Sequence, residues 1–242
     1  MKFSDEGIII ETKKYGEKSL IVKIFSREHG IYRGFVRSVK SSKAAAIYQI
    51  GNLVSFEYIS RLEENLGSFT SLDLIESFCS KIIFERTKLE CANSLFYLLN
   101  HCFLERENHE DLFFELRDFL KKISADDFSN QQTIAAYIKL ELNILEALGY
   151  GVDLSCCVVT NSTVDLAYVS PKSARAVSIS AAKTYERKLL KLPNFLIEDA
   201  ANYDEVHLLE GLKLSGFFIE KFLFEEKKSH STHRKNILKI LE

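Results

Sequence analysis

The sequence predicts an α+β protein in which a small strand-rich domain precedes a mainly helical one. Up to about residue 78, short apolar runs alternate with polar residues and end at glycine, asparagine or serine, as strands and tight turns do. Beyond that point, apolar residues recur at helical spacing. Only 2 prolines and 10 glycines occur in 242 residues, which favours long helices over linkers. We therefore expect domains at residues 1–78 and 79–242.

Five strands are expected in the first domain, with a short helix over 44–49 between the third and the fourth. The strands are predicted at residues 5–15, 19–26, 30–39, 53–59 and 67–75. This layout is that of a five-stranded OB-fold barrel, whose face and loops commonly bind oligonucleotides. An SH3-like barrel has a similar number of strands, and periodicity does not separate the two.

Two of these strands have informative faces. The second is apolar on both sides, which indicates a central strand. On the third, the period of two places Arg33, Phe35 and Arg37 on one face with Ile31, and Tyr32, Gly34 and Val36 on the other.

The second domain is predicted to be built from helices around one irregular segment. Helical spacing covers residues 82–103, 132–148, 204–224 and 232–241, and a further helix that ends near 123 is expected to have Asn108 as its N-cap. Residues 149–180 lack such spacing and hold Cys156 and Cys157. This segment is expected to be held by apolar packing, with a short hairpin as one possibility.

Positive charge is concentrated at the N-terminus. Residues 1–43 contain ten lysines and arginines against five acidic residues, a net charge of +5, whereas the whole chain has −2. Such a basic, strand-rich module is suited to a polyanion. The candidate DNA-binding residues are Lys13, Lys14, Lys18, Arg27, Arg33, Arg37, Lys40 and Lys43. The competing interpretation is a solvated rim that keeps the barrel soluble.

Aromatic residues on the same strands are candidates for stacking on unpaired bases. These are Tyr15, Tyr32 and Phe35. An aromatic residue on a barrel strand is more often part of the core, so a packing role stays open for each.

Several classes of site are not expected. Cys156 and Cys157 are adjacent and tend to point apart, and no cysteine follows them, so we predict no zinc site and no other cofactor. No nucleophile elbow or phosphate-binding glycine loop occurs, so we predict no enzyme activity. No apolar run approaches the ~20 residues of a membrane span, and a cytosolic protein is expected.

Basic residues also occur on the last two predicted helices. Lys213 and Lys221 lie about two helical turns apart and could bind an acidic peptide with an apolar end. The remaining ones, Arg234 among them, are interpreted as ordinary helix-surface charge.

Three stretches of the chain together resemble the RecO family of bacterial recombination mediators. The first comprises GIII at 7–10, YGE at 15–17, FSREHG at 25–30 and GNL at 51–53. The second comprises LGYGVDL at 148–154 and YVSPK at 168–172. The third is LKLSGFF at 212–218. The stretches occur in the same order as in that family and span most of the chain.

The resemblance implies an OB-fold, a helical body and a segment that is a zinc finger in some members, from which this chain departs by lacking the ligands. It also implies a non-enzymatic mediator that binds and anneals single-stranded and double-stranded DNA in the cytoplasm, associated with the nucleoid. The implied partners are the acidic tail of single-strand-binding protein, a RecR-type mediator and, indirectly, the recombinase, with no membrane. The alternative is a protein-interaction adaptor without direct DNA binding.

Overall fold

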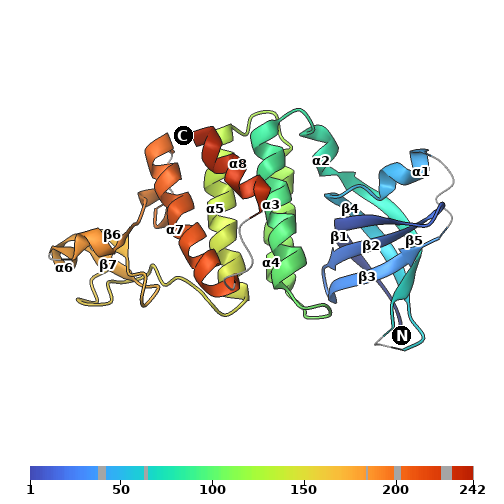
Figure 1. Ribbon diagram of the computed structural model, residues 1–242, viewed down its shortest axis with the longest axis horizontal. Coiled ribbons are helices and arrows are strands. Elements are labelled where there is room, and N and C mark those ends of the chain that lie inside the picture. The colour runs from blue at the N-terminus through green and yellow to red at the C-terminus, as the bar shows by residue number, and fades with distance from the viewer. Residues whose placement is uncertain (38–41, 63–64, 184, 199–202, 225–230, 242) are drawn as a thin grey trace. The chain divides into compact units, whose positions relative to one another are not determined.

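The computed structural model describes residues 1–37, 42–62, 65–183, 185–198, 203–224 and 231–241 (Figure 1). The chain forms two compact units, residues 1–127 and 128–242. The first unit contains helices as well as strands, so independent folding of residues 1–78 stays a prediction.

The strands of the first unit form a barrel. They are β1 (Lys2–Tyr15), β2 (Ser19–Ser26), β3 (Gly30–Val36), β4 (Asn52–Ile59) and β5 (Gly67–Ser77), with α1 (Ser42–Ile47) between β3 and β4. All five predicted strands and the intervening helix are therefore confirmed. The third strand ends at Val36 rather than 39, and residues 38 and 39 lie outside the described part of the chain.

The strand order distinguishes the OB-fold from the SH3-like barrel. The order is β1-β2-β3-β5-β4, and β1 also pairs with β4, so the sheet curls round on itself. The seam between β3 and β5 is parallel and only two residue pairs long, Gly34 with Gly67 and Phe35 with Ser68. A five-stranded, partly open barrel of this kind is the OB-fold.

Gly67 allows this seam to form. A Cβ atom on Gly67 would lie 2.3 Å from the ring of Tyr58. In the absence of a side chain, the Gly67 amide donates a hydrogen bond of 2.9 Å to the Tyr58 hydroxyl.

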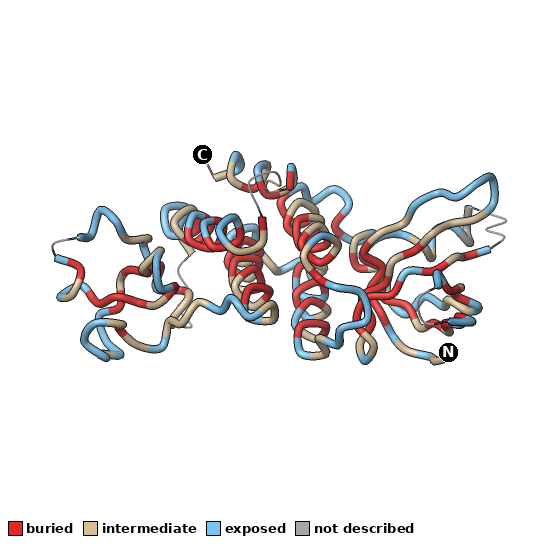
Figure 2. Tube along the Cα trace, turned by 60° about the horizontal axis from the view of Figure 1, so that its bottom comes forward, coloured by how far each residue is buried: buried red, intermediate tan, exposed pale blue. Residues whose placement is uncertain are grey.

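Buried residues lie both in the barrel and in the helices (Figure 2), and those of β2 include Val22 and Ile24 on its inner face and Phe25 on its outer face. Val22 and Ile24 point into the barrel with Tyr32 and Val36 of β3, the two residues that the period of two places on one face of that strand. The opposite face of β2 packs on helices, where the ring of Phe25 lies 5.9 Å from that of Phe113. These helices are α2 (Phe78–Lys81), α3 (Arg86–Cys102) and α4 (Glu110–Ile123). The N-cap of α4 is His109, so the prediction of Asn108 at that position is wrong by one residue.

The second unit is built on α5 (Asn130–Ala147), α7 (Glu205–Leu223) and α8 (Thr232–Leu241). Ser129 and Gln132 form a capping box at the start of α5, and Asp204 caps α7. The segment predicted to be irregular contains β6 (Leu166–Val169), β7 (Ala176–Ser178) and the start of α6 (Ile179–Ala182). β8 (Leu190–Lys191) completes a small sheet of order β7-β6-β8.

The interpretation of Arg234 as surface charge is wrong. Its side chain is only 4% exposed and its Nε donates to Oε1 of Glu141 at 2.8 Å, while that carboxylate is fully buried. Nη2 of Arg234 donates to the Leu212 carbonyl at 2.6 Å, and the hydroxyl of Ser215 donates to Glu141 at 2.6 Å. Tyr137 donates a further short hydrogen bond to Glu141. The charge of Arg234 therefore attaches α8 to α5 and α7.

We predict that Arg234→Ala lowers the free energy of unfolding by about 3–5 kcal/mol, because it leaves the Glu141 carboxylate buried without a counter-charge. Urea unfolding followed by circular dichroism measures this. The control Lys235→Ala removes the exposed neighbouring charge and should change the same free energy by less than ~0.5 kcal/mol. Equal stability of the two variants would contradict the assignment.

Candidate nucleic-acid interface

The free end of the barrel gathers exposed basic and aromatic residues from β1, β2 and β3. Lys13 of β1 is level with Ile21 of β2, which is level with Phe35 of β3, so these three side chains form an outward row. The β1–β2 turn lies just beyond, where Gly16 adopts φ +65°. We call this region the distal surface, and it comprises Lys13, Lys14, Tyr15, Lys18, Phe35 and Arg37.

The cations of the distal surface are available to a ligand. Lys14, Lys18 and Arg37 are exposed and make no ion pair with any residue that the structure describes. Lys13 lies 2.8 Å from Glu11, but its side chain is 66% exposed. An exposed pair of this kind contributes only about 0.2–1 kcal/mol. Lys13 can therefore exchange its partner for a phosphate at little cost.

The aromatic candidates divide between surface and core. Tyr15 is 57% exposed, and its ring meets that of Phe35 edge-on at 5.2 Å. Together they offer a ring face beside the lysines. Tyr32 is instead part of the barrel core, with its ring 5.0 Å from that of Tyr58. The structure therefore does not bring Tyr32 to the distal surface.

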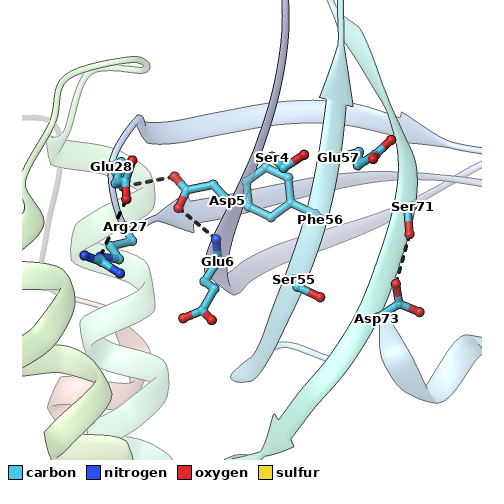
Figure 3. Close-up of a pocket in the computed structure, with 10 residues that line it drawn as sticks. All are labelled: Ser4, Asp5, Glu6, Arg27, Glu28, Ser55, Phe56, Glu57, Ser71 and Asp73. Atoms are coloured by element: carbon cyan, nitrogen blue, oxygen red, sulfur yellow. Dashed lines mark hydrogen bonds and ion pairs between the residues drawn. The ribbon is translucent and has the colours of Figure 1, made fainter.

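Two predicted DNA-binding arginines lie elsewhere on the first unit. Arg27 donates from Nε to Glu110 at 2.9 Å, and this hydrogen bond raises the pKa of the guanidinium. Arg27 also lines an acidic pocket of about 480 Å³, to which Asp5, Glu6, Glu28, Glu57 and Asp73 contribute (Figure 3). Arg33 lies 3.5 Å from Glu105, although its side chain is 52% exposed. Neither arginine extends the distal surface.

Lys23, which contributes to the N-terminal charge, is used internally. Its Nζ donates to the Asn100 carbonyl at 3.2 Å, and burial lowers the pKa of the ammonium. Two further candidates are not placed as side chains. Lys40 lies outside the described residues, and Lys43 lies in α1 with only its backbone described.

A second pocket of about 310 Å³ contains a basic residue that periodicity did not single out. Arg37 lies on one side of it, and Arg61, Asn65 and Leu66 on the other. Residues 61–66 read in sequence as a polar connector, which gives no reason to select Arg61. The sequence shows only that Arg61 lies two residues after the fourth strand, and its position opposite Arg37 follows from how the sheet curls.

Lys213 and Lys221 lie on one face of α7, with Phe217 between them. Lys213 and Phe217 are exposed. The Nζ of Lys221 donates to the Pro171 carbonyl at 2.5 Å and lies 4.7 Å from the ring centre of Phe222. This face therefore combines positive charge with exposed apolar area.

The cysteine-containing segment is held by hydrogen bonds and one ion pair. Arg175 lies 3.0 Å from Asp153, and Arg175 also donates to the sulfur of Cys156 at 3.5 Å. The buried sulfur of Cys157 accepts the amide and hydroxyl of Ser178 at 3.2 and 3.4 Å. Burial raises the pKa of Cys157, but these donors and those of Thr160 outweigh it and lower the pKa to about 6.

Within the described ranges, no three histidine, cysteine or acidic side chains gather as a metal site would require. Among the same residues, none of the helices has the length and apolarity needed to cross a membrane.

Comparison with known proteins covers nearly the whole chain. Residues 1–78 match the family model described as recombination protein O N terminal, and residues 84–231 match recombination protein O C terminal. The chain is 37% identical over 228 residues to the DNA repair protein RecO of Rickettsia typhi, covering 94% of each chain. It is also 35% identical over 241 residues to that of Rickettsia canadensis, covering 100% of this chain and 97% of the relative.

We predict a pH dependence of stability that arises at Cys157. Its folded pKa of about 6 lies below that of an unfolded thiol, so the stabilisation is complete above the unfolded pKa and disappears as the pH falls through 6. In Cys157→Ala, the gain in melting temperature from pH 6 to pH 9 should be smaller than in the wild type. Cys156→Ala is the matched control and should retain the gain. An unchanged gain in Cys157→Ala would contradict the assignment.

Proposed function

The chain belongs to the RecO family of DNA repair proteins, and on that basis we propose that it acts in recombinational repair as a non-enzymatic mediator. In this role it binds and anneals DNA strands. It also helps to place the strand-exchange recombinase on single-stranded DNA covered by single-strand-binding protein, together with a RecR-type partner. Its place of action is the cytoplasm, in association with the nucleoid.

The observation that supports DNA binding is the distal surface. Lys13, Lys14, Lys18 and Arg37 can each neutralise a phosphate, and every neutralised phosphate releases counterions. Tyr15 adds an exposed ring on which an unpaired base can stack. Neither interaction depends on base identity, as is appropriate for a protein that acts on any damaged sequence.

The acidic pocket beside Arg27 restricts the part of the barrel to which a DNA strand can bind. Its carboxylates repel phosphates, whereas the distal surface attracts them, so a strand is steered to one part of the barrel. We therefore omit Arg27 from the proposed DNA contacts and retain Arg33 as a peripheral one, since its side chain remains 52% exposed.

The α7 face defined by Lys213, Phe217 and Lys221 supports the proposed contact with single-strand-binding protein. An acidic tail with an apolar end needs cations and a neighbouring apolar surface, and this face provides both. Because it belongs to the second unit and the distal surface to the first, the two contacts can be altered separately.

The DNA-binding proposal is tested by the double variant Lys14→Glu, Lys18→Glu. Its affinity for single-stranded DNA should fall about tenfold or more at moderate salt, and its salt slope should shrink by about 0.7 for each phosphate that the variant no longer neutralises. Fluorescence anisotropy across a salt series measures both quantities. The control Arg86→Glu, Lys121→Glu makes the same charge change at exposed helical positions of the same unit. Equal losses in both variants, or binding indifferent to salt, would refute the proposal.

The partner proposal is tested by titrating an acidic peptide that has an apolar C-terminal residue. Lys213→Glu should weaken peptide binding about tenfold, since it replaces an attraction with a repulsion. DNA binding should stay unchanged in this variant. Lys239→Glu alters an exposed lysine of α8 and is the control. Were the wild type to bind the peptide and not DNA, the chain would be an adaptor rather than a DNA-binding mediator.

A further inference from the structure

The connection between α3 and α4 is fixed along the start of β3. Ile31 of β3 forms a parallel β-bridge with Glu105, and the Arg106 amide donates to the Ile31 carbonyl at 3.0 Å. A Cβ atom on Gly30 would lie only 1.9 Å from the carbonyl oxygen of Glu107, so the absence of a side chain there allows this close approach. The position of Glu105 is therefore set by the backbone around it.

This arrangement holds the Glu105 carboxylate beside two cations on the outer face of the barrel. Oε1 of Glu105 lies 3.5 Å from Nε of Arg33, and Arg33 is level with Lys23 of β2. Burial lowers the pKa of Lys23, and Glu105 is the carboxylate that counteracts this shift most strongly. One carboxylate therefore acts on both the exposed Arg33 and the partly buried Lys23.

The two cations differ in what they offer to a ligand. Lys23 is held by the helical part of the unit, because its Nζ donates to the Asn100 carbonyl at 3.2 Å. The Arg33 side chain is 52% exposed and lies two residues before Phe35, on the same face of β3. A phosphate that binds next to the distal surface can therefore reach Arg33, where it meets Glu105. A carboxylate and a phosphate bind a guanidinium through the same N–H groups, so the two anions compete.

We propose that Glu105 is an internal competitor for DNA phosphates, which occupies Arg33 and keeps this arginine from contributing fully to DNA binding. Because the competitor belongs to the same chain and its backbone is fixed, the ion pair re-forms whenever a phosphate leaves. Such a limit on affinity suits a protein that passes a DNA strand on, since very tight binding would retain the strand. This inference rests on the proposed DNA-binding function, and it explains why the contact at Arg33 stays peripheral.

The test uses Glu105→Gln, which removes the charge and keeps the size of the side chain. Its binding of a fluorescein-labelled oligodeoxythymidylate should be about two- to fivefold tighter than that of the wild type, as the strength of an exposed ion pair implies. The slope of log affinity against log salt should become steeper by about 0.7, because Arg33 then neutralises one more phosphate. Glu107→Gln is the matched control, since it removes the same charge from a side chain that is 53% exposed on the same connection. The control should gain less affinity and keep the wild-type slope.

A double variant tests the role of Arg33 without changing the net charge. Arg33→Gln, Glu105→Gln deletes both members of the ion pair and should bind the oligodeoxythymidylate within about twofold of the wild type, because Arg33 is largely occupied there. If the double variant keeps the gain of Glu105→Gln, the gain does not come from Arg33 and the inference is overturned. Binding weaker than the twofold range would show that Arg33 already contacts DNA fully in the wild type, which overturns it as well. Unchanged melting temperatures show that the variants are folded.

The competitor and the DNA-binding proposal fail in different ways. If Glu105→Gln binds as the wild type does while Lys14→Glu, Lys18→Glu binds more weakly, the competitor is refuted and the distal surface stands. Equal gains in Glu105→Gln and Glu107→Gln refute the competitor too, since they reflect only the lost negative charge. If the wild type binds no DNA, the proposed function itself fails.

Discussion

The two-sided burial of β2 is the constraint on which the first unit depends. Ile24 fills the barrel, and its neighbour Phe25 packs on Phe113 of α4, so neither face of the strand can be uncovered without exposing apolar area. Because α4 contacts one end of the outer face, that end is closed to a large ligand. The opposite end, with the β1–β2 turn, is left for the cations. A packing requirement in the core thus determines where a polyanion can approach.

The same constraint divides the N-terminal positive charge into two groups. Lys23 and Arg27 lie near the helices, where Asn100 and Glu110 accept their hydrogen bonds. Lys14 and Lys18 lie at the free end without an acidic partner among the described residues. A net charge counted along the sequence therefore overstates the charge that is available to a ligand. The separation of acidic and basic surfaces on one barrel, rather than the total of +5, is what can orient a strand.

Local periodicity predicts the helices and strands, but it does not predict which residues interact when they lie far apart in the sequence. β2 and α8 were predicted at their observed bounds because strand and helix patterns are local. Arg234 was misread because its partner Glu141 lies 93 residues away, and nothing in a helix whose charged residues are all basic marks one arginine as buried. Tyr32 and Tyr15 look alike in a strand pattern, although the pleat and the strand end place one in the core and one at the surface. The pocket at Arg61 depends on where β3 and β5 part, which is a property of the curled sheet and not of either strand.

The segment around Cys156 and Cys157 shows how a small lobe can be ordered by hydrogen bonds to sulfur. In a zinc finger, metal coordination draws distant chain segments together and keeps the thiolates charged. Here the amide and the hydroxyl of Ser178 both donate to the sulfur of Cys157. The ion pair between Arg175 and Asp153 joins the loop at Asp153 to the start of β7. These contacts tie the two sides of the lobe together, and the donors of Ser178 favour the thiolate form of Cys157. Each such bond contributes far less than a metal ion, so the lobe also needs the β6–β7 pairing and the buried Val169 and Ala176. We therefore expect the stability of this lobe to depend on the protonation state of the Cys157 sulfur.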